Sequence, residues 1–241
     1  MIVEHELQSL VSEARDAWEA NAVWWAERMQ DGPGGDALRT GALNETILSA
    51  VPPGCSRILD LACGEGYLSR MLARADVQVT ALDWSLGMMR AGQASSPSQR
   101  RISWIVGDSG LLPCGDGEYD FVLCSMAAMD IVDIEQAFGE ARRVVRRSGE
   151  GLWTVLDPDA VKSRPEDYLT VVRREARSVP LAEWAAWVRI ASDQPLPTLY
   201  AHRSVSTYTE TFRRTGWAVQ GATRIRGDPL PSAIVFRVRA L

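Results

Sequence analysis

From residue 57 onward, short apolar runs alternate with amphipathic stretches along the chain. The apolar runs are typical of buried strands and occupy residues 57–61, 77–82, 102–106, 119–124 and 151–156. Helical patterns separate them at 67–75, at 86–94 and after Asp133, where apolar residues recur at steps of three and four. Strands that are apolar on both faces and alternate with helices indicate a parallel sheet with helices on both sides. The predicted fold class is therefore α/β, of the doubly wound Rossmann-like kind.

The segments that flank this core are less regular. Residues 4–30 show one helical pattern that stops at the breaker DGPGGD, a short helix is expected over 41–50, and residues 1–50 are predicted to form a helical lid. Five prolines interrupt residues 158–203 around two short helical patches, which we interpret as a cap inserted into the domain. A helix at 204–215, a strand at 217–225 and a last strand in SAIVFRVRAL complete a single domain over residues 1–241.

Composition and charge exclude several kinds of partner. The 241 residues carry a formal net charge of −5 and a pI of about 5.2, so the chain lacks the basic footprint of a nucleic-acid-binding protein. No stretch reaches membrane-spanning length, and the N-terminus lacks a secretory signal pattern. The four cysteines have no metal-ligand spacing, so we expect no metal. These features predict a cytoplasmic protein with no membrane or nucleic-acid partner.

Candidate chemistry begins with the stretch ILDLACGEGYLSR, where a glycine-rich turn joins a strand to a helix. Gly64 and Gly66 let the backbone approach a ligand at the carboxyl edge of the sheet, beside a helix N-terminus, although such a turn alone is equally often structural. Acids follow at successive strand ends: Asp60, Asp83 and Asp108. A carboxylate after the second strand can accept from both ribose hydroxyls, and one after the third can accept from an exocyclic amino group. Together they predict an adenosine site, while each acid alone is also explained by turn capping or solvation.

The surroundings favour a cationic adenosine ligand over a dinucleotide. The turn reads D-x-A-x-G-x-G rather than G-x-G-x-x-G, with Ala62 where a stricter fingerprint has glycine, and no lysine or arginine marks a phosphate. Acidic surroundings suit a sulfonium and an ammonium, and repel a pyrophosphate. The residues therefore favour an adenosine ligand that carries a sulfonium and an ammonium group.

Four motifs carry a family resemblance. ILDLACGEGYLSR, VTALDWS, VGDSGLLPCGDGEYDFVLCSMAAMDI and ARRVVRRSGEGLWTVLDP resemble the successive motifs of class I S-adenosylmethionine-dependent methyltransferases, closest to the ubiquinone/menaquinone-type and small-molecule members. The likeness spans about residues 57–157. It implies a seven-stranded sheet whose last strand is antiparallel.

The resemblance also implies roles for individual residues. The methionine part of the cofactor would be surrounded by Asp60, Ala62, Cys63, Gly64 and Gly66. Asp83 would hold the ribose, Trp84 and Met88 would pack near the adenine, and Asp108 with Ser109 would read the adenine edge. The transferable methyl would lie over Cys124, Ser125 and Met126.

The acceptor side is less well marked. The lid that contacts the acceptor has three candidate tryptophans, Trp18, Trp24 and Trp25, which ordinary core packing would also explain. Arg39 is a candidate partner of the methionine carboxylate, or else a surface arginine. His202 lies in a segment similar to one beside the active site of small-molecule members, which makes it a candidate base. It is equally a candidate structural histidine, because Ser204 and Ser206 are good helix starts. Asp130 is a second candidate base, and Tyr200 a candidate acceptor contact.

The prediction is a methyltransferase that acts on a small organic molecule, with specialised metabolites among the candidate acceptors. Two alternatives stay open: a methyltransferase-fold protein that binds the cofactor without catalysis, and a nucleotide-linked oxidoreductase. Methylation at oxygen, nitrogen or carbon, the use of a base and the formation of a homodimer are equally open at this stage.

Overall fold

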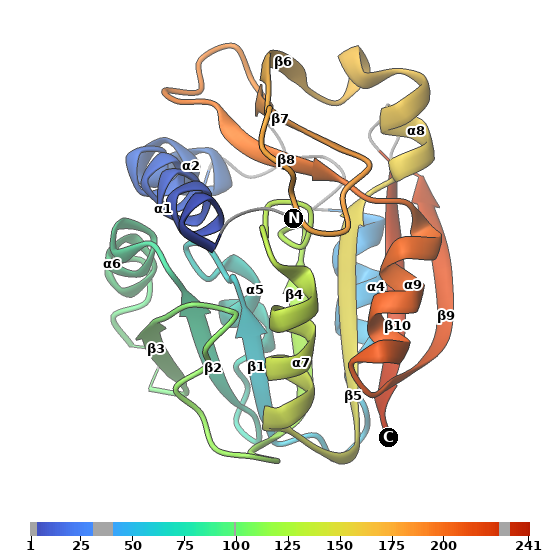
Figure 1. The fold of residues 1–241 in the computed structure, drawn as a ribbon. Helices are drawn as coiled ribbons and strands as arrows, with labels where there is room; N and C mark the ends of the chain where they lie inside the picture. Colours follow the sequence, from blue (N-terminus) through green and yellow to red (C-terminus); the bar gives the residue numbers. More distant parts are fainter. Residues whose placement is uncertain (1–3, 31–40, 99, 227–231) are drawn as a thin grey trace.

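A seven-stranded mixed sheet forms the centre of the molecule (Figure 1). The computed structural model describes residues 4–30, 41–98, 100–226 and 232–241. The strand order is β3-β2-β1-β4-β5-β10-β9, and all pairs are parallel except those of β10 with β5 and β9. The strands are β1 (Arg57–Leu61), β2 (Gln78–Asp83), β3 (Ile102–Val106), β4 (Tyr119–Ser125), β5 (Val145–Leu156), β9 (Trp217–Arg226) and β10 (Ser232–Ala240). The predicted fold class and the antiparallel last strand are confirmed.

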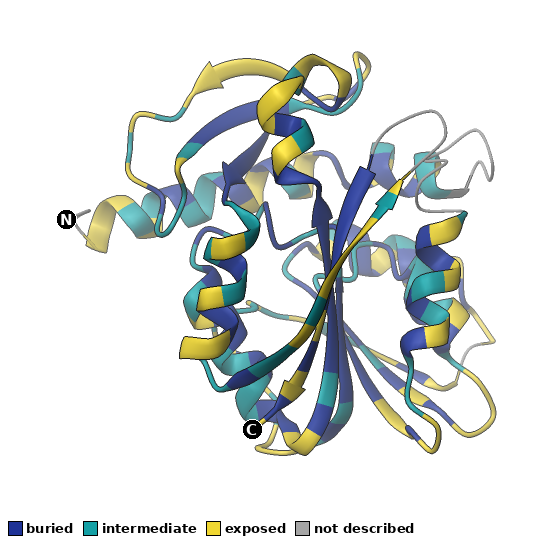
Figure 2. Cartoon of the chain, turned by 90° about the vertical axis from the view of Figure 1, so that its right-hand side faces the viewer, coloured by how far each residue is buried: buried dark blue, intermediate teal, exposed yellow. Residues whose placement is uncertain are grey.

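Helices cover both faces of this sheet, as the apolar strands require. In Figure 1, α7 (Ile134–Val144) and α9 (Val205–Arg214) lie in front of the sheet, and α4 (Ala42–Ala50) and α5 (Tyr67–Leu72) lie behind it. Phe138 of α7 stacks on Phe212 of α9 with ring centroids 4.1 Å apart, and both rings pack on Trp153 of β5. The central strands are buried along almost their whole length (Figure 2).

Two helix boundaries differ from the sequence prediction. The expected helix over 4–30 is two helices, α1 (Glu4–Ala20) and α2 (Ala22–Gln30), that part at Asn21. The fully buried Asn21 amide donates to the carbonyls of Ala17 and Leu196 and accepts from the Leu196 N–H, which fixes a turn there. The helix after Asp133 ends at Val144, and β5 begins at once instead of after Gly149.

Residues 158–203 contain more strand than predicted. After α8 (Pro158–Ser163) and the short 3₁₀ helix η2 (Pro165–Asp167), an antiparallel sheet forms in the order β6-β7-β8. Its strands are β6 (Thr170–Arg174), β7 (Trp184–Arg189) and β8 (Thr198–His202). The sequence prediction of two helical patches missed these three strands.

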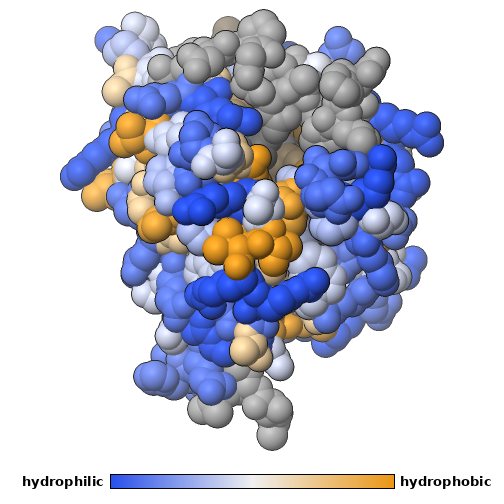
Figure 3. Space-filling model, turned by 90° about the horizontal axis from the view of Figure 1, so that it is seen from above, coloured by the Kyte–Doolittle hydropathy of each residue, from blue (hydrophilic) through white to orange (hydrophobic). Residues whose placement is uncertain are grey.

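This second sheet lies above the carboxyl edge of the main sheet, with α1 packed beside it (Figure 1). Leu10 and Ala14 of α1 share a buried apolar cluster with Trp187 and Leu199 of the sheet. Viewed from this side, hydrophobic groups gather near the middle of the face and hydrophilic residues surround them (Figure 3). Within the described residues, none of the helices is both long enough and apolar enough to cross a membrane.

Candidate active site

A cavity of about 480 Å³ lies at the carboxyl ends of β1 to β4, below the β6–β8 sheet. Volumes of this size hold a cofactor-sized ligand. Its wall combines segments that are distant in sequence: α1 and α2, the loops after four parallel strands, and the β6–β8 region. It includes Val11, Trp18, Trp25, Arg28, Ala62, Cys63, Gly64, Asp83, Trp84, Met88, Asp108, Ser109, Ser125, Met126, Met129, Asp130, Leu156, Tyr168, Leu169, Val188, Ile190, Thr198 and Tyr200.

The loop after β1 brings backbone into this wall. Ala62, Gly64 and Gly66 all have positive φ, at 53°, 58° and 74°. Ala62, Cys63 and Gly64 line the cavity, and the Gly64 N–H donates to Asp83 Oδ2 at 2.8 Å. Gly66 does not line it: a Cβ there would lie 2.4 Å from the Trp104 ring, so this glycine is needed for helix entry and for packing. Gly66 therefore lies outside the described wall, and its contact with the methionine part stays a prediction.

Two carboxylates with raised pKa values lie at the ends of β1 and β2. Asp83 lines the cavity and accepts from the N–H groups of Gly64 and Ser85. Burial raises the pKa of Asp83 to about 6 although both N–H groups favour the charged form. Asp60 is 1% exposed and lies behind the wall, where Ser69 Oγ donates to it at 2.6 Å. Burial raises the pKa of Asp60 to about 7, opposed by the Ser69 hydrogen bond and reinforced by the charge of Asp83.

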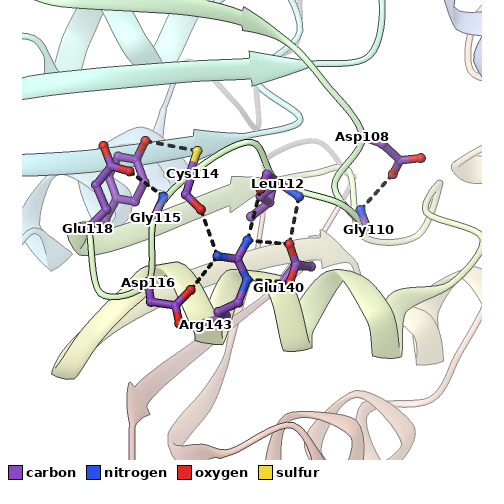
Figure 4. A network of polar contacts seen from close by, with 10 residues as sticks. Asp108, Gly110, Leu112, Cys114, Gly115, Asp116, Glu118, Glu140 and Arg143 are labelled. Carbon is purple, nitrogen blue, oxygen red and sulfur yellow. Dashed lines mark hydrogen bonds and ion pairs between the residues drawn. The ribbon is translucent and has the colours of Figure 1, made fainter.

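The loop after β3 presents Asp108 and Ser109 to the cavity. Asp108 Oδ1 also accepts from the Gly110 N–H at 2.8 Å, so its turn-forming role is real as well. The same loop is held by α7 (Figure 4): the Arg143 guanidinium donates to the carbonyls of Leu112 and Cys114, and Glu140 accepts from the Leu112 N–H. The loop that carries Asp108 is thereby tied to a buried helix.

The end of β4 contributes Ser125 and Met126. Met126 has a φ of 56°, and its N–H donates to the carbonyl and the hydroxyl of Thr154. Cys124 is fully buried behind the wall, and burial raises its pKa well above the usual value, as expected for an inert thiol. Cys124 thus lies outside the described wall, and its place under the methyl group stays a prediction. Asp130 does line the cavity.

The tryptophans of α1 and α2 divide between two environments. Trp18 and Trp25 line the cavity and meet edge to face at 5.7 Å. Trp24 lies outside the described wall, where its Nε1 donates to Asp193, and its contact with an acceptor stays a prediction. Arg39 lies outside the described residues. Arg28 lines the cavity instead, a residue that sequence reasoning missed although it lies one turn after Trp25.

Glu19 links α1 to this site through hydrogen bonds. At the end of α1, its carboxylate accepts from Ser85 Oγ at 2.6 Å and from the Gly87 N–H at the start of α6 (Leu86–Ala94). Ser85 in turn donates its N–H to Asp83. No pattern in the sequence marked Glu19, because its partners are 66 and 68 residues away.

His202 does not reach the cavity. Its side chain is 1% exposed and stacks on Trp184 at 4.8 Å with an interplanar angle of 4°. Burial lowers its pKa. Tyr200, which lines the cavity, has its hydroxyl 3.4 Å from His202 Nδ1. His202 therefore lies outside the described wall, next to Tyr200, and its role as a base stays a prediction.

Part of the cavity wall is apolar and comes largely from residues that sequence reasoning did not single out. Leu156, Leu169, Val188 and Ile190 supply aliphatic surface, and Tyr168 supplies an aromatic ring. Across the described wall there are five aspartates (Asp83, Asp108, Asp130, Asp133 and Asp167) and one arginine. This balance favours a ligand that carries positive charge.

The comparisons with known proteins agree with this geometry. Residues 58–149 match a family model described as a methyltransferase domain. Over this segment, which is less than half of the chain, the protein is similar to S-adenosylmethionine-dependent methyltransferases. An S-adenosylmethionine-dependent methyltransferase from Mesorhizobium loti superposes with a TM-score of 0.61 at 19% identity, over 83% of this chain and 98% of that one.

Curated proteins match the central part of the chain. Demethylmenaquinone methyltransferase of Renibacterium salmoninarum is 34% identical over 116 residues, 48% of this chain and 47% of that protein. Malonyl-[acyl-carrier protein] O-methyltransferase of Pseudescherichia vulneris is 35% identical over 99 residues, 41% and 38% of the two chains. The chain thus spans about half the length of the curated relatives it matches.

Proposed function

We propose that this protein transfers the methyl group of S-adenosylmethionine to a small organic molecule. The observation that carries the proposal is one cavity with two kinds of wall. Asp83 and Asp108 lie at the carboxyl ends of adjacent strands, and apolar side chains of the β6–β8 region line other parts of the wall. A cofactor with its acceptor fits such a divided space better than either ligand alone.

In the cofactor half, Asp83 accepts hydrogen bonds from the ribose hydroxyls, and Asp108 and the Ser109 backbone meet the adenine edge. Trp84 and Met88 pack on the base. The amide groups of Ala62 to Gly64 surround the methionine part, and Ser125 and Met126 lie beside the methyl group. The lining of the cavity by all of these residues supports the assignment.

In the acceptor half, α1 and α2 act as a lid and residues 158–203 as a cap. Trp18, Trp25, Tyr168 and Tyr200 offer aromatic surface to the acceptor, together with the aliphatic side chains of Leu156 and its neighbours. The relatives are named for different acceptors, demethylmenaquinone and malonyl-[acyl-carrier protein], so their names define classes to test. Quinone precursors and specialised metabolites form the first acceptor panel.

Methyl transfer is an in-line displacement: the acceptor nucleophile attacks the methyl carbon, the carbon–sulfur bond breaks, and S-adenosylhomocysteine leaves. The protein contributes orientation and exclusion of water. A nucleophile that carries a proton must lose it. Asp130 in the cavity wall is one route, and the Tyr200 hydroxyl is another, because it can accept that proton as it donates its own to neutral His202.

Isothermal titration with S-adenosylmethionine and S-adenosylhomocysteine tests the cofactor assignment. Binding of both is expected, and no heat from either in the hundreds-of-micromolar range would contradict it. Quenching of tryptophan fluorescence by NADH, unaffected by S-adenosylhomocysteine, would favour the oxidoreductase alternative. Cofactor binding without a methylated product from any acceptor of the panel would favour the non-catalytic alternative. We propose a cytoplasmic location, which the four free thiols support.

A further inference from the structure

Arg203 is a buried arginine at the point where the cap meets the core. It lies between β8 and α9, is 1% exposed and does not line the cavity. Among the described residues, its hydrogen-bond partners are neutral: four backbone carbonyls and the side chain of Tyr208. Burial lowers the pKa of Arg203, but a guanidinium stays charged in proteins. A buried charge with neutral partners is costly, which suggests a role beyond packing.

The guanidinium joins a loop of the cavity wall to the cap. It donates to the carbonyls of Ala128, Ile131 and Val132, at 3.4, 3.0 and 2.8 Å, and these three residues belong to the loop between β4 and α7. It also donates to the carbonyl of Pro180, in the connection between β6 and β7, at 3.2 Å. Because a guanidinium presents its N–H groups in a fixed plane, these bonds set the position of the loop relative to the cap.

A backbone hydrogen bond extends this connection. The Ala201 N–H of β8 donates to the Met129 carbonyl at 2.8 Å. The next residues along, Tyr200 on β8 and Asp130 in the loop, both line the cavity. Burial raises the pKa of Tyr200 well above its usual value; the charge of Asp130 reinforces this shift and that of Arg203 opposes it. The two side chains proposed as proton routes are therefore held on the two segments that Arg203 joins.

We propose that Arg203 is a positioning residue for methyl transfer, which holds the loop after β4 against the cap so that Asp130 and Tyr200 face the acceptor from fixed places. The inference rests on the proposed function. Arg203 lies behind the cavity wall, so it acts on the acceptor only through the segments it joins. The cofactor carboxylates Asp83 and Asp108 belong to other strand ends, and cofactor affinity should not depend on Arg203.

Arg203→Lys tests this role, because lysine keeps the charge and loses the planar set of donors. In hydrogen exchange of the ligand-free protein, read by mass spectrometry, peptides over residues 126–133 and 198–203 should exchange about tenfold faster than in wild type. Exchange over residues 61–66 and the affinity for S-adenosylhomocysteine in isothermal titration should not change. With an acceptor that the wild type methylates, kcat should fall about tenfold or more, because the acceptor is less well oriented.

Arg142→Lys is the matched control. The Arg142 guanidinium also donates to backbone carbonyls, those of Val145, Gly216 and Leu241. These lie near the C-terminus, at the end of the sheet opposite the cap (Figure 1). This substitution removes the same kind of contact and should change neither the exchange of residues 126–133 nor kcat.

Unchanged exchange over residues 126–133, or an unchanged kcat, would overturn the inference. A loss of cofactor affinity equal to the loss in kcat, with faster exchange over residues 61–66, would also overturn it, because that pattern indicates a general loss of structure. If Arg203→Lys does not fold, Arg203→Met removes the donors without burying an ammonium group and gives the same test. A wild type that binds no S-adenosylhomocysteine or methylates no acceptor contradicts the proposed function instead, and the exchange comparison still shows whether Arg203 holds the loop.

Discussion

Replacement of Asp60 by asparagine should make the ligand-free protein more stable at alkaline pH. Asp60 is buried beside Asp83 and Glu65, and burial raises its pKa to about 7 from an ordinary value of 3.8. A carboxyl group whose pKa is raised by folding stabilises the protein when protonated. That stability is present below about pH 4 and is lost as the pH rises to about 7. Asparagine keeps the shape and the hydrogen-bonding capacity toward Ser69 without a charge.

The size of the effect follows from the two pKa values. For a pKa of about 7 in the folded state and 3.8 in the unfolded state, linkage removes about 2–3 kcal/mol of stability between pH 5 and pH 8. This is a large share of a typical domain stability of about 5–15 kcal/mol. The free energy of unfolding of wild type relative to Asp60→Asn should therefore fall by that amount across this range.

Urea unfolding of both proteins at pH 5 and pH 8, without ligand, measures this difference. Asp120→Asn is the matched control with the opposite sign. Burial opposes ionisation of Asp120, but the N–H groups of Ser56 and Arg57 outweigh it and lower its pKa to about 2. That variant should lose stability at pH 8. A wild-type stability that does not decline relative to Asp60→Asn between pH 5 and pH 8 would refute the argument that Asp60 is held in an unfavourable charged state.

Three further predictions concern the loop, the ribose carboxylate and the proton route. Gly66→Ala should lower the free energy of unfolding by about 2–4 kcal/mol, because Gly66 has a positive φ and an added Cβ would clash with the Trp104 ring. Gly139 lies within α7, where an added Cβ meets nothing within 4 Å, so Gly139→Ala should raise the free energy of unfolding by up to about 1 kcal/mol. Equal effects of the two substitutions in urea unfolding would contradict this. The affinity for S-adenosylhomocysteine should fall by up to about tenfold per pH unit below pH 6, as Asp83 becomes protonated. Asp83→Asn should bind this ligand more weakly, and its affinity should not vary with pH in this range. The same pH profile in the variant would exclude Asp83 as its source. With an acceptor that loses a proton, Tyr200→Phe should lower kcat about tenfold or more and leave cofactor affinity unchanged; an unchanged kcat would exclude the route through His202.

The sequence was sufficient for the parts of the fold that rest on local periodicity. Buried strands and amphipathic helices alternate in the order that the apolar pattern predicts, and the acids at strand ends meet because parallel strands share one carboxyl edge. The three strands of the cap escaped prediction because they are short, lie among prolines and pair only with one another. The break at Asn21 depends on hydrogen bonds to Leu196, a contact 175 residues away that no local pattern reveals.

Some of the residues predicted for the site lie outside the cavity wall, for related reasons. Trp24 and Trp25 are neighbours on one helix and point about 100° apart, and the sequence alone does not say which of them faces the cavity. Tyr200 and His202 share a face of β8, but the cavity ends between them and Trp184 covers the histidine. Side-chain burial and tertiary contacts, rather than motif position, decide these roles.

A crystal structure with S-adenosylhomocysteine bound would show whether this cavity is the cofactor site. We expect the ribose hydroxyls within hydrogen-bonding distance of Asp83, the adenine amino group at Asp108 and the sulfur beside Ser125. Ligand density outside this cavity, or a ribose turned away from Asp83 within it, would refute the cofactor assignment.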